Sequence, residues 1–120
     1  MHSIIPVYDD KGKLTGYDIT LTRGDSLPLQ LTLKRDNATY TPDPESEIRF
    51  AMKAKYKDPD EDVVLLKDIP PETLLLNFLP ADTKELPMGK TYVYDIEITD
   101  ETGYTETFLK GKFTIGEEVI

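Results

Sequence analysis

The chain contains no cysteine and no tryptophan, and its single histidine is His2. Without cysteine, disulfides, thiolate metal sites and a cysteine nucleophile are all excluded. A Ser–His–acid triad would have to use His2, which lies near a chain end, where packing holds side chains poorly. The 7 glycines are scattered at turns, so the sequence offers no glycine-rich phosphate loop. These absences leave few routes to enzymatic chemistry.

Long apolar runs and an excess of positive charge are also lacking. No run approaches the roughly 18 apolar residues that span a bilayer, and residues 1–6 do not show the basic and then apolar order of a signal peptide. Acidic residues number 23 against 14 lysines and arginines, which gives a formal net charge of −9. Because an acidic surface repels phosphate backbones and anionic lipids, we expect neither nucleic acid nor a membrane among the partners.

Strand signals dominate what is present. The 120 residues suit one domain, so we assign residues 1–120 to a single domain. Alternating apolar and polar residues, which are typical of strands with one buried side, occupy residues 27–34, 48–53, 92–99 and 112–115. Residues 4–8 and 17–22 are rich in the β-branched and aromatic residues that strands prefer. Residues 63–66 and 74–79 are short apolar runs, and periodicity leaves their facing and their place in the strand order open.

Turn signals separate these runs. Asp9-Asp10-Lys11-Gly12 and Asp100-Glu101-Thr102-Gly103 each end in a glycine that can take the left-handed conformation of a tight hairpin. Asp36-Asn37 is a further turn candidate. The polar residues 37–47 and 55–62 are predicted to form loops.

These patterns predict an all-β protein, an immunoglobulin-like antiparallel β-sandwich with one short helical turn near residues 81–86. The disulfide and tryptophan that mark antibody domains are both impossible here. Tyr92, which begins a predicted strand, is a candidate for a tyrosine corner, and an ordinary core aromatic is the alternative.

Several side chains are candidates for functional sites. The acidic residues 58–62 offer oxygen ligands for Ca²⁺ but lack the order of an EF-hand loop, so a solvated loop is expected and metal binding stays open. Arg23-Gly24-Asp25 matches the integrin-binding tripeptide, and a structural turn is the alternative. Tyr40, Tyr56 and Tyr104 lie near loops, where an aromatic ring packs locally, anchors a partner or stacks on a sugar. Acidic residues are plentiful, but nothing singles out a pair for glycoside hydrolysis.

The sequence therefore predicts no catalytic, cofactor-binding or metal-binding residue, no cofactor, and a protein that is not an enzyme.

Four segments together resemble a known family: residues 19–26, residues 48–53, residues 86–96 and residues 111–115. They look like the N-terminal domain of the upper baseplate protein of tailed phages that infect Gram-positive bacteria, over about residues 17–116. The resemblance implies a β-sandwich that serves as an assembly module in a virion, with no enzymatic role and no catalytic residues.

From this resemblance we expect a non-enzymatic phage or prophage structural protein, a tail or baseplate module that acts through protein–protein contacts. Its partners would be other virion or tail proteins, and it would form a homo-oligomer, since virion parts are symmetric. Its place would be the virion and, during assembly, the host cytoplasm. The alternative is a bacterial surface or secreted immunoglobulin-like module that binds carbohydrate or protein.

Overall fold

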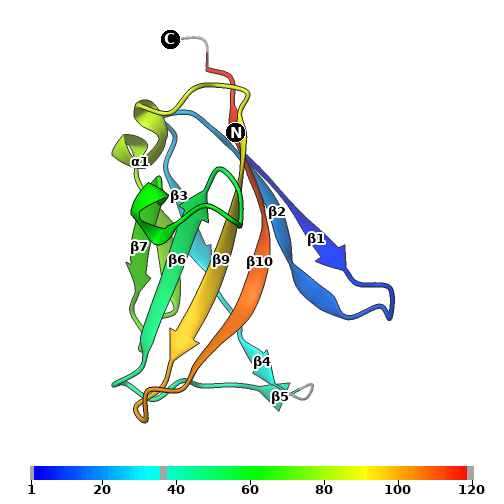
Figure 1. Cartoon of the computed structure of the whole chain (residues 1–120), viewed down its shortest axis with the longest axis vertical. Coiled ribbons are helices and arrows are strands. Elements are labelled where there is room, and N and C mark those ends of the chain that lie inside the picture. The colour runs from blue at the N-terminus through cyan, green and yellow to red at the C-terminus, as the bar shows by residue number, and fades with distance from the viewer. Residues whose placement is uncertain (1, 36–37, 119–120) are drawn as a thin grey trace.

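The structure is a computed structural model that describes residues 2–35 and 38–118. Strands dominate it (Figure 1), and among the described residues a single short α-helix lies at one end of the molecule. The elements in chain order are β1 (His2–Tyr8), β2 (Leu14–Thr22), β3 (Leu27–Gln30), β4 (Lys34–Arg35), β5 (Ala38–Thr39), β6 (Glu47–Lys53), the 3-10 turn η1 (Asp60–Asp62), β7 (Leu65–Ile69), β8 (Leu75–Phe78), α1 (Pro80–Lys84), β9 (Thr91–Thr99) and β10 (Thr105–Gly116). The all-β prediction is confirmed.

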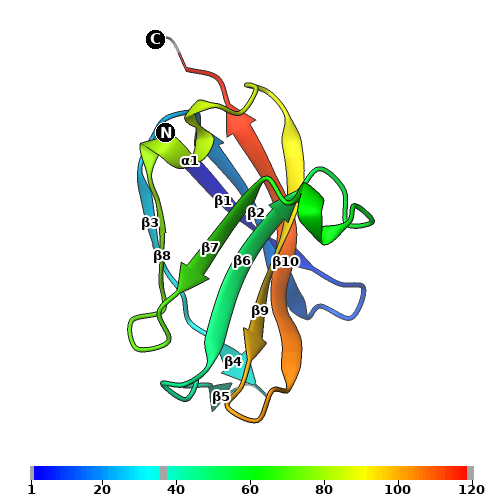
Figure 2. The same cartoon turned by 60° about the vertical axis from the view of Figure 1, so that its left-hand side comes forward.

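Six strands form one sheet in the order β1-β2-β10-β9-β6-β7, and β3 pairs with β8 in a second sheet. The two sheets lie over each other, as the turned view shows (Figure 2). The large sheet is mixed, because β10 runs parallel to β2 from Phe113 to Gly116 while the other strand pairs of this sheet are antiparallel. The prediction of a purely antiparallel sandwich is therefore wrong at this pair. Alternation within a strand reports which face is buried and carries no information on the direction of a distant neighbour.

The core lies between the two sheets. The alternation predicted for residues 48–53 and 92–99 is confirmed, because β6 and β9 pair in register with every second side chain buried. At the centre, the Phe50 ring stacks on Tyr94 at 5.1 Å and meets the edges of Phe78 and Phe113. Burying such aromatic side chains removes large apolar areas from water, which stabilises the fold at roughly 25 cal/mol per Å².

Two of the predicted strands differ in length in the structure. The alternation over residues 27–34 continues through the buried Leu33, but the ladder with β8 ends at Gln30 and β4 begins at Lys34. The strand predicted at residues 112–115 is the end of a much longer strand, β10, whose ladder with β9 is irregular between Thr107 and Leu109. A β-bulge of this kind interrupts the alternation that reveals a strand in sequence.

The structure places the two apolar runs whose facing the sequence left open. The run at residues 63–66 enters strand β7 only at Leu65, because the Val63 N–H bonds the Asp60 carbonyl at the end of η1. The run at residues 74–79 contains β8, in which Leu76 and Phe78 are buried and Leu75 is exposed.

Both predicted Asp–Gly hairpins are confirmed, and they are built alike. The Asp9 carboxylate accepts the N–H groups of Lys11 and Lys13, and the Gly12 N–H bonds the Asp9 carbonyl. Asp100 makes the corresponding bonds in the second hairpin. The turn predicted at Asp36-Asn37 lies outside the described residues.

The predicted helical turn is α1, which begins at Pro80 and ends at Lys84, slightly earlier than the predicted residues 81–86. Proline suits a first helical position because its missing N–H needs no partner there. The Asp82 carboxylate accepts the Leu79 N–H and pairs with Lys67 of β7, which attaches the helix to the large sheet. The helix ends where Leu86 bonds back to the Thr83 carbonyl. Within the described residues, neither α1 nor η1 has the length and apolar character that crossing a bilayer requires.

Candidate functional site

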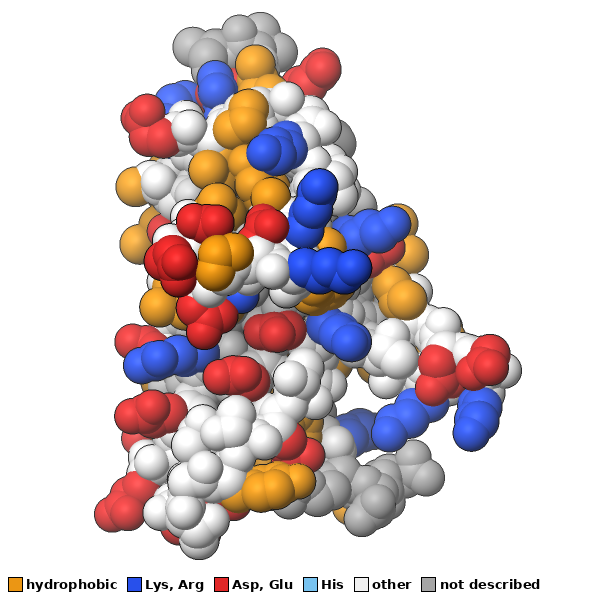
Figure 3. All heavy atoms as spheres, in the orientation of Figure 1, with side chains coloured by type: hydrophobic (Ala, Val, Ile, Leu, Met, Phe, Trp, Pro, Cys, Tyr) orange, Lys and Arg blue, Asp and Glu red, His pale blue; other side chains and the backbone are white. Residues whose placement is uncertain are grey.

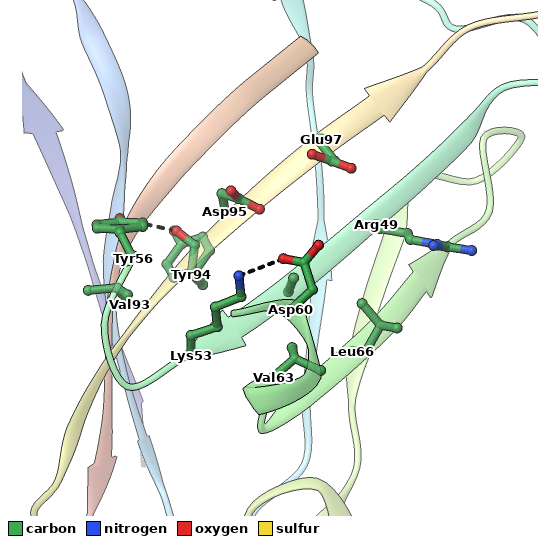
Figure 4. Close-up of a pocket in the computed structure, with 11 residues that line it drawn as sticks. Arg49, Lys53, Tyr56, Asp60, Val63, Leu66, Val93, Tyr94, Asp95 and Glu97 are labelled. Carbon is green, nitrogen blue, oxygen red and sulfur yellow. Dashed lines mark hydrogen bonds and ion pairs between the residues drawn. The ribbon is translucent and has the colours of Figure 1, made fainter. Parts of the chain in front are cut away.

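A hollow lies on the outer face of the large sheet, away from the core. It has a volume of about 280 Å³ and is bounded by β6, β9 and the segment between β6 and β7 (Figure 4). Apolar side chains from both strands and from the segment line part of it, namely Ala51, Val63, Leu66 and Val93. Its polar groups are Arg49, Lys53, Tyr56, Asp60, Asp95 and Glu97.

Tyr56 holds the segment against the sheet at one end of the hollow. Its hydroxyl donates to the main-chain carbonyls of Tyr94 at 3.3 Å and Gly111 at 3.2 Å, on adjacent strands. Lys110 lies over its ring with the ammonium 5.6 Å from the centroid. Burial and the nearby charge of Asp95 raise the pKa of Tyr56, so its hydroxyl stays a donor.

Lys53 ties the other end of the segment down. Its ammonium bonds the Asp60 carboxylate at 2.8 Å and the Asp58 carbonyl at 3.0 Å. The hydrogen bond between the Lys53 ammonium and the Asp60 carboxylate raises the pKa of Lys53 and lowers the pKa of Asp60. Because Asp60 is fully exposed, the pair fixes geometry more than it stabilises the fold.

Asp95 and Glu97 stand two residues apart on β9, which places both on the same outer face. Burial raises the pKa of Asp95, and the charges of Lys53 and Lys110 oppose that rise. Ala51 and Lys110 flank Asp95 on the neighbouring strands. The hollow therefore offers acceptors and donors of both charges beside an anchored aromatic ring.

The acidic residues 58–62 form η1 and the turn before it. Asp58 accepts the Lys55 N–H, and Asp60 pairs with Lys53. In the part of the chain that the structure describes, no three histidine or acidic side chains converge as a metal ion requires. Asp58 and Asp60 thus help to hold the segment that borders the hollow.

The Arg23-Gly24-Asp25 tripeptide takes the structural role that its alternative reading predicted. The Asp25 N–H bonds the Thr22 carbonyl, and Gly24, at φ +83°, donates its N–H to the buried Thr83 hydroxyl. Arg23 pairs with Glu118 at 2.8 Å. The tripeptide is thereby built into a turn that contacts α1, which is not how a free integrin-binding loop is presented.

The remaining tyrosines divide between packing and exposure. Tyr40 stacks on Phe108 at 5.5 Å, whereas Tyr104 is 63% exposed. Tyr92 is buried, and its ring lies below the Lys90 ammonium. The hydroxyl that reaches a distant main-chain carbonyl belongs to Tyr94, which donates to Tyr17 on another strand. The tyrosine-corner prediction at Tyr92 therefore gives way to its alternative, a core aromatic.

Four polar residues of the hollow were not predicted: Arg49, Lys53, Asp95 and Glu97. Each occupies a polar, solvent-facing position in a strand whose alternation was predicted correctly. Arg49 lies directly opposite Glu97, and Ala51 opposite Asp95, once β6 and β9 pair. Only that pairing, which the sequence does not state, brings the charges together.

No protein-family model matches this chain, and neither a curated protein nor a solved structure matches it.

Proposed function

We propose that this chain is a non-enzymatic structural protein of a phage or prophage particle, a tail or baseplate module with an immunoglobulin-like sandwich fold. It acts through contacts with other virion proteins and with copies of itself, in the virion and, during assembly, in the host cytoplasm. The resemblance of residues 17–116 to the upper baseplate family supports the proposal that the chain belongs to a phage particle. One structural observation supports the proposal that it acts through protein–protein contacts.

That observation is the character of edge strand β1. Natural proteins protect edge strands with charged residues, short length or coverage. β1 has seven residues and contains no Asp, Glu, Lys or Arg. Within it, Ile5 is 58% and Tyr8 60% exposed. In a chain in which 31% of residues are charged, an uncharged and uncovered edge strand is typical of a surface that another protein covers.

Quantitative mass spectrometry of particles purified from cells that carry the gene tests this proposal. The chain is expected at a fixed ratio to the major tail proteins, and a soluble control protein from the same lysate is expected to be lost during purification. Particles that assemble normally without the chain would refute the proposal.

The hollow on the outer face favours a second candidate, a surface or secreted module that binds carbohydrate. A tyrosine ring bordered by carboxylates and ammonium groups supplies stacking and hydrogen bonds of both directions, which sugar recognition uses. Glycan-array binding that is lost in Asp95→Asn and retained in Tyr104→Phe supports this candidate. An array without signal for the wild-type chain removes it.

A further inference from the structure

The inner face of the large sheet is only partly covered. Ile4 lies opposite Ile19 in the ladder of β1 and β2, so the two side chains share this face. Ile19, which lies under the second sheet, is 4% exposed, whereas Ile4 is 38% exposed. The second sheet contains only β3 and β8, and every residue of β1 is exposed or only partly buried. The core face thus continues beyond its cover.

A groove of about 210 Å³ marks this edge of the sandwich, between Ile4 and Tyr17 on one side and Leu29 and Leu31 on the other. Tyr8 and Leu14 are cross-strand partners farther along the same hairpin, and they are 60% and 37% exposed. The ladder is irregular between Val7 and Tyr8, where β2 has the extra residue Thr15 and β1 has none. Counting along β1 by twos from Ile4 therefore places Tyr8, with its partner Leu14, on the inner face as well. We call these six residues, Ile4, Tyr8, Leu14, Tyr17, Leu29 and Leu31, the inner strip.

Neither the inner strip nor the groove contains an acidic residue, a lysine or an arginine. None occurs in β1 either. The hairpin tip beyond the strip carries Asp9 and Asp10 together with Lys11 and Lys13, so its charge is balanced. The hairpin projects from the rest of the molecule (Figure 1), and side chains of both signs cover its tip (Figure 3).

The distribution of charge on the surface favours a second copy of this chain as the partner. Two molecules that each carry a net charge of −9 repel each other. They can meet at short range where the surface is neutral, or where each presents both signs to the other. The inner strip meets the first condition and the hairpin tip meets the second. A strongly basic partner would instead be drawn to the acidic remainder of the surface, which the strip does not include.

Packing through the face is favoured over strand addition at an edge. Pro6 interrupts the row of N–H groups along the outer edge of β1, and Pro28 does the same in β3. Face-to-face packing of sheets needs no such row, because interdigitating side chains carry it at a spacing of about 10 Å.

We propose that two copies of this chain dock through their inner strips, face to face across a two-fold axis, so that each copy supplies the cover that the second sheet of the other lacks. Such a contact is isologous, since the same patch serves both partners. The proposal rests on the proposed function in protein assembly and names the surface and the first partner.

Sedimentation velocity from about 1 to 100 μM protein tests it with a matched pair of variants. Ile4→Lys places a charge in the strip, whereas Ile5→Lys places the same charge on the opposite face of the same strand. The wild-type chain and Ile5→Lys are expected to dimerise with similar affinity. Ile4→Lys and Tyr8→Lys are expected to weaken dimerisation by about 100-fold, as buried interface charges do. Unchanged circular dichroism and thermal unfolding show that each variant is folded.

Three results would overturn the proposal: a monomeric wild-type chain over the whole range, equal weakening by Ile4→Lys and Ile5→Lys, or a strip that binds another purified tail protein and not a second copy. None of them bears on whether the chain is present in purified particles. Failure of the dimer and failure of the structural role are therefore separate outcomes.

Discussion

The hydroxyl of Tyr94 donates a hydrogen bond to the main-chain carbonyl of Tyr17 over 2.5 Å, which joins β9 to β2 across the intervening strand β10. Gly111 of β10 lies between them, and a Cβ atom there would collide with the Tyr17 carbonyl and crowd the Tyr94 ring. On the outer face, the Tyr56 hydroxyl donates to the main-chain carbonyls of Tyr94 and Gly111. Both faces of the sheet are thus tied together at one place.

Gly111→Ala is expected to destabilise the fold by about 2–4 kcal/mol, because the added methyl forces main-chain atoms apart. Lys112→Ala, at the exposed neighbouring position, is expected to change the free energy of unfolding by less than about 0.5 kcal/mol. Urea unfolding followed by circular dichroism measures both. Equal stability of the two variants would show that β2 and β10 can separate at this point without cost.

Tyr94→Phe removes the hydroxyl and leaves the Tyr17 carbonyl without this donor, at an expected cost of about 1–2 kcal/mol at pH 7. Burial raises the pKa of Tyr94 above that of an unfolded tyrosine. The unfolded chain therefore loses this proton first, and wild-type stability falls as the pH rises past about 10.

Tyr94→Phe should flatten that alkaline decline, while Tyr104→Phe, at an exposed position, should leave it unchanged. Thermal unfolding between pH 8 and 12 is the measurement. A decline that is equally steep in all three proteins would assign it to other groups.

Glu118→Gln tests the connection between the turn after β2 and the end of the described chain. Hydrogen bonds from Lys84 and Arg23 lower the pKa of Glu118. The unfolded chain therefore takes up this proton first as the pH falls, and the contribution of Glu118 is present above about pH 4.3 and lost below it. Glu118→Gln should be less stable at pH 7 and should lose less on acidification than Glu117→Gln, the matched control. Parallel pH profiles for the two variants would contradict this role.

Strand faces were predictable wherever one side of a strand is buried and the ladder is regular. β9 is the clearest case, since Tyr92, Tyr94, Ile96 and Ile98 are all buried as their spacing indicated. The hairpins at Asp9 and Asp100 were predictable as well, because their geometry depends on local carboxylate and glycine chemistry.

The strand neighbours and the sites were not predictable. The parallel pairing of Ile19 with Phe113 joins residues far apart in the chain, and no local pattern encodes it. The hollow depends on that same strand order. The exposure of Ile4 also escaped prediction, because an apolar residue in a strand reads as buried whether or not a second sheet covers it.

Tyr56→Phe should loosen the segment over the outer hollow while leaving the core intact. The change removes both hydrogen bonds to the sheet and keeps the ring. Amide hydrogen exchange in residues 54–64 is expected to accelerate several-fold, since local opening becomes easier. The exposed Lys57→Ala serves as control and should not change it. Unaltered exchange in Tyr56→Phe would mean that the Lys53–Asp60 pair alone holds the segment.

The most direct test of the assembly role is lysine cross-linking and mass spectrometry on purified particles. Lys11 and Lys13 lie between β1 and β2, at the tip of the hairpin that carries the inner strip, whereas Lys57 belongs to the segment between β6 and β7, which borders the outer hollow. The account predicts that the particles contain this chain and that intermolecular links to tail proteins and to other copies involve Lys11 and Lys13. Particles that lack the chain, or intermolecular links confined to Lys57 and its neighbours, would contradict it.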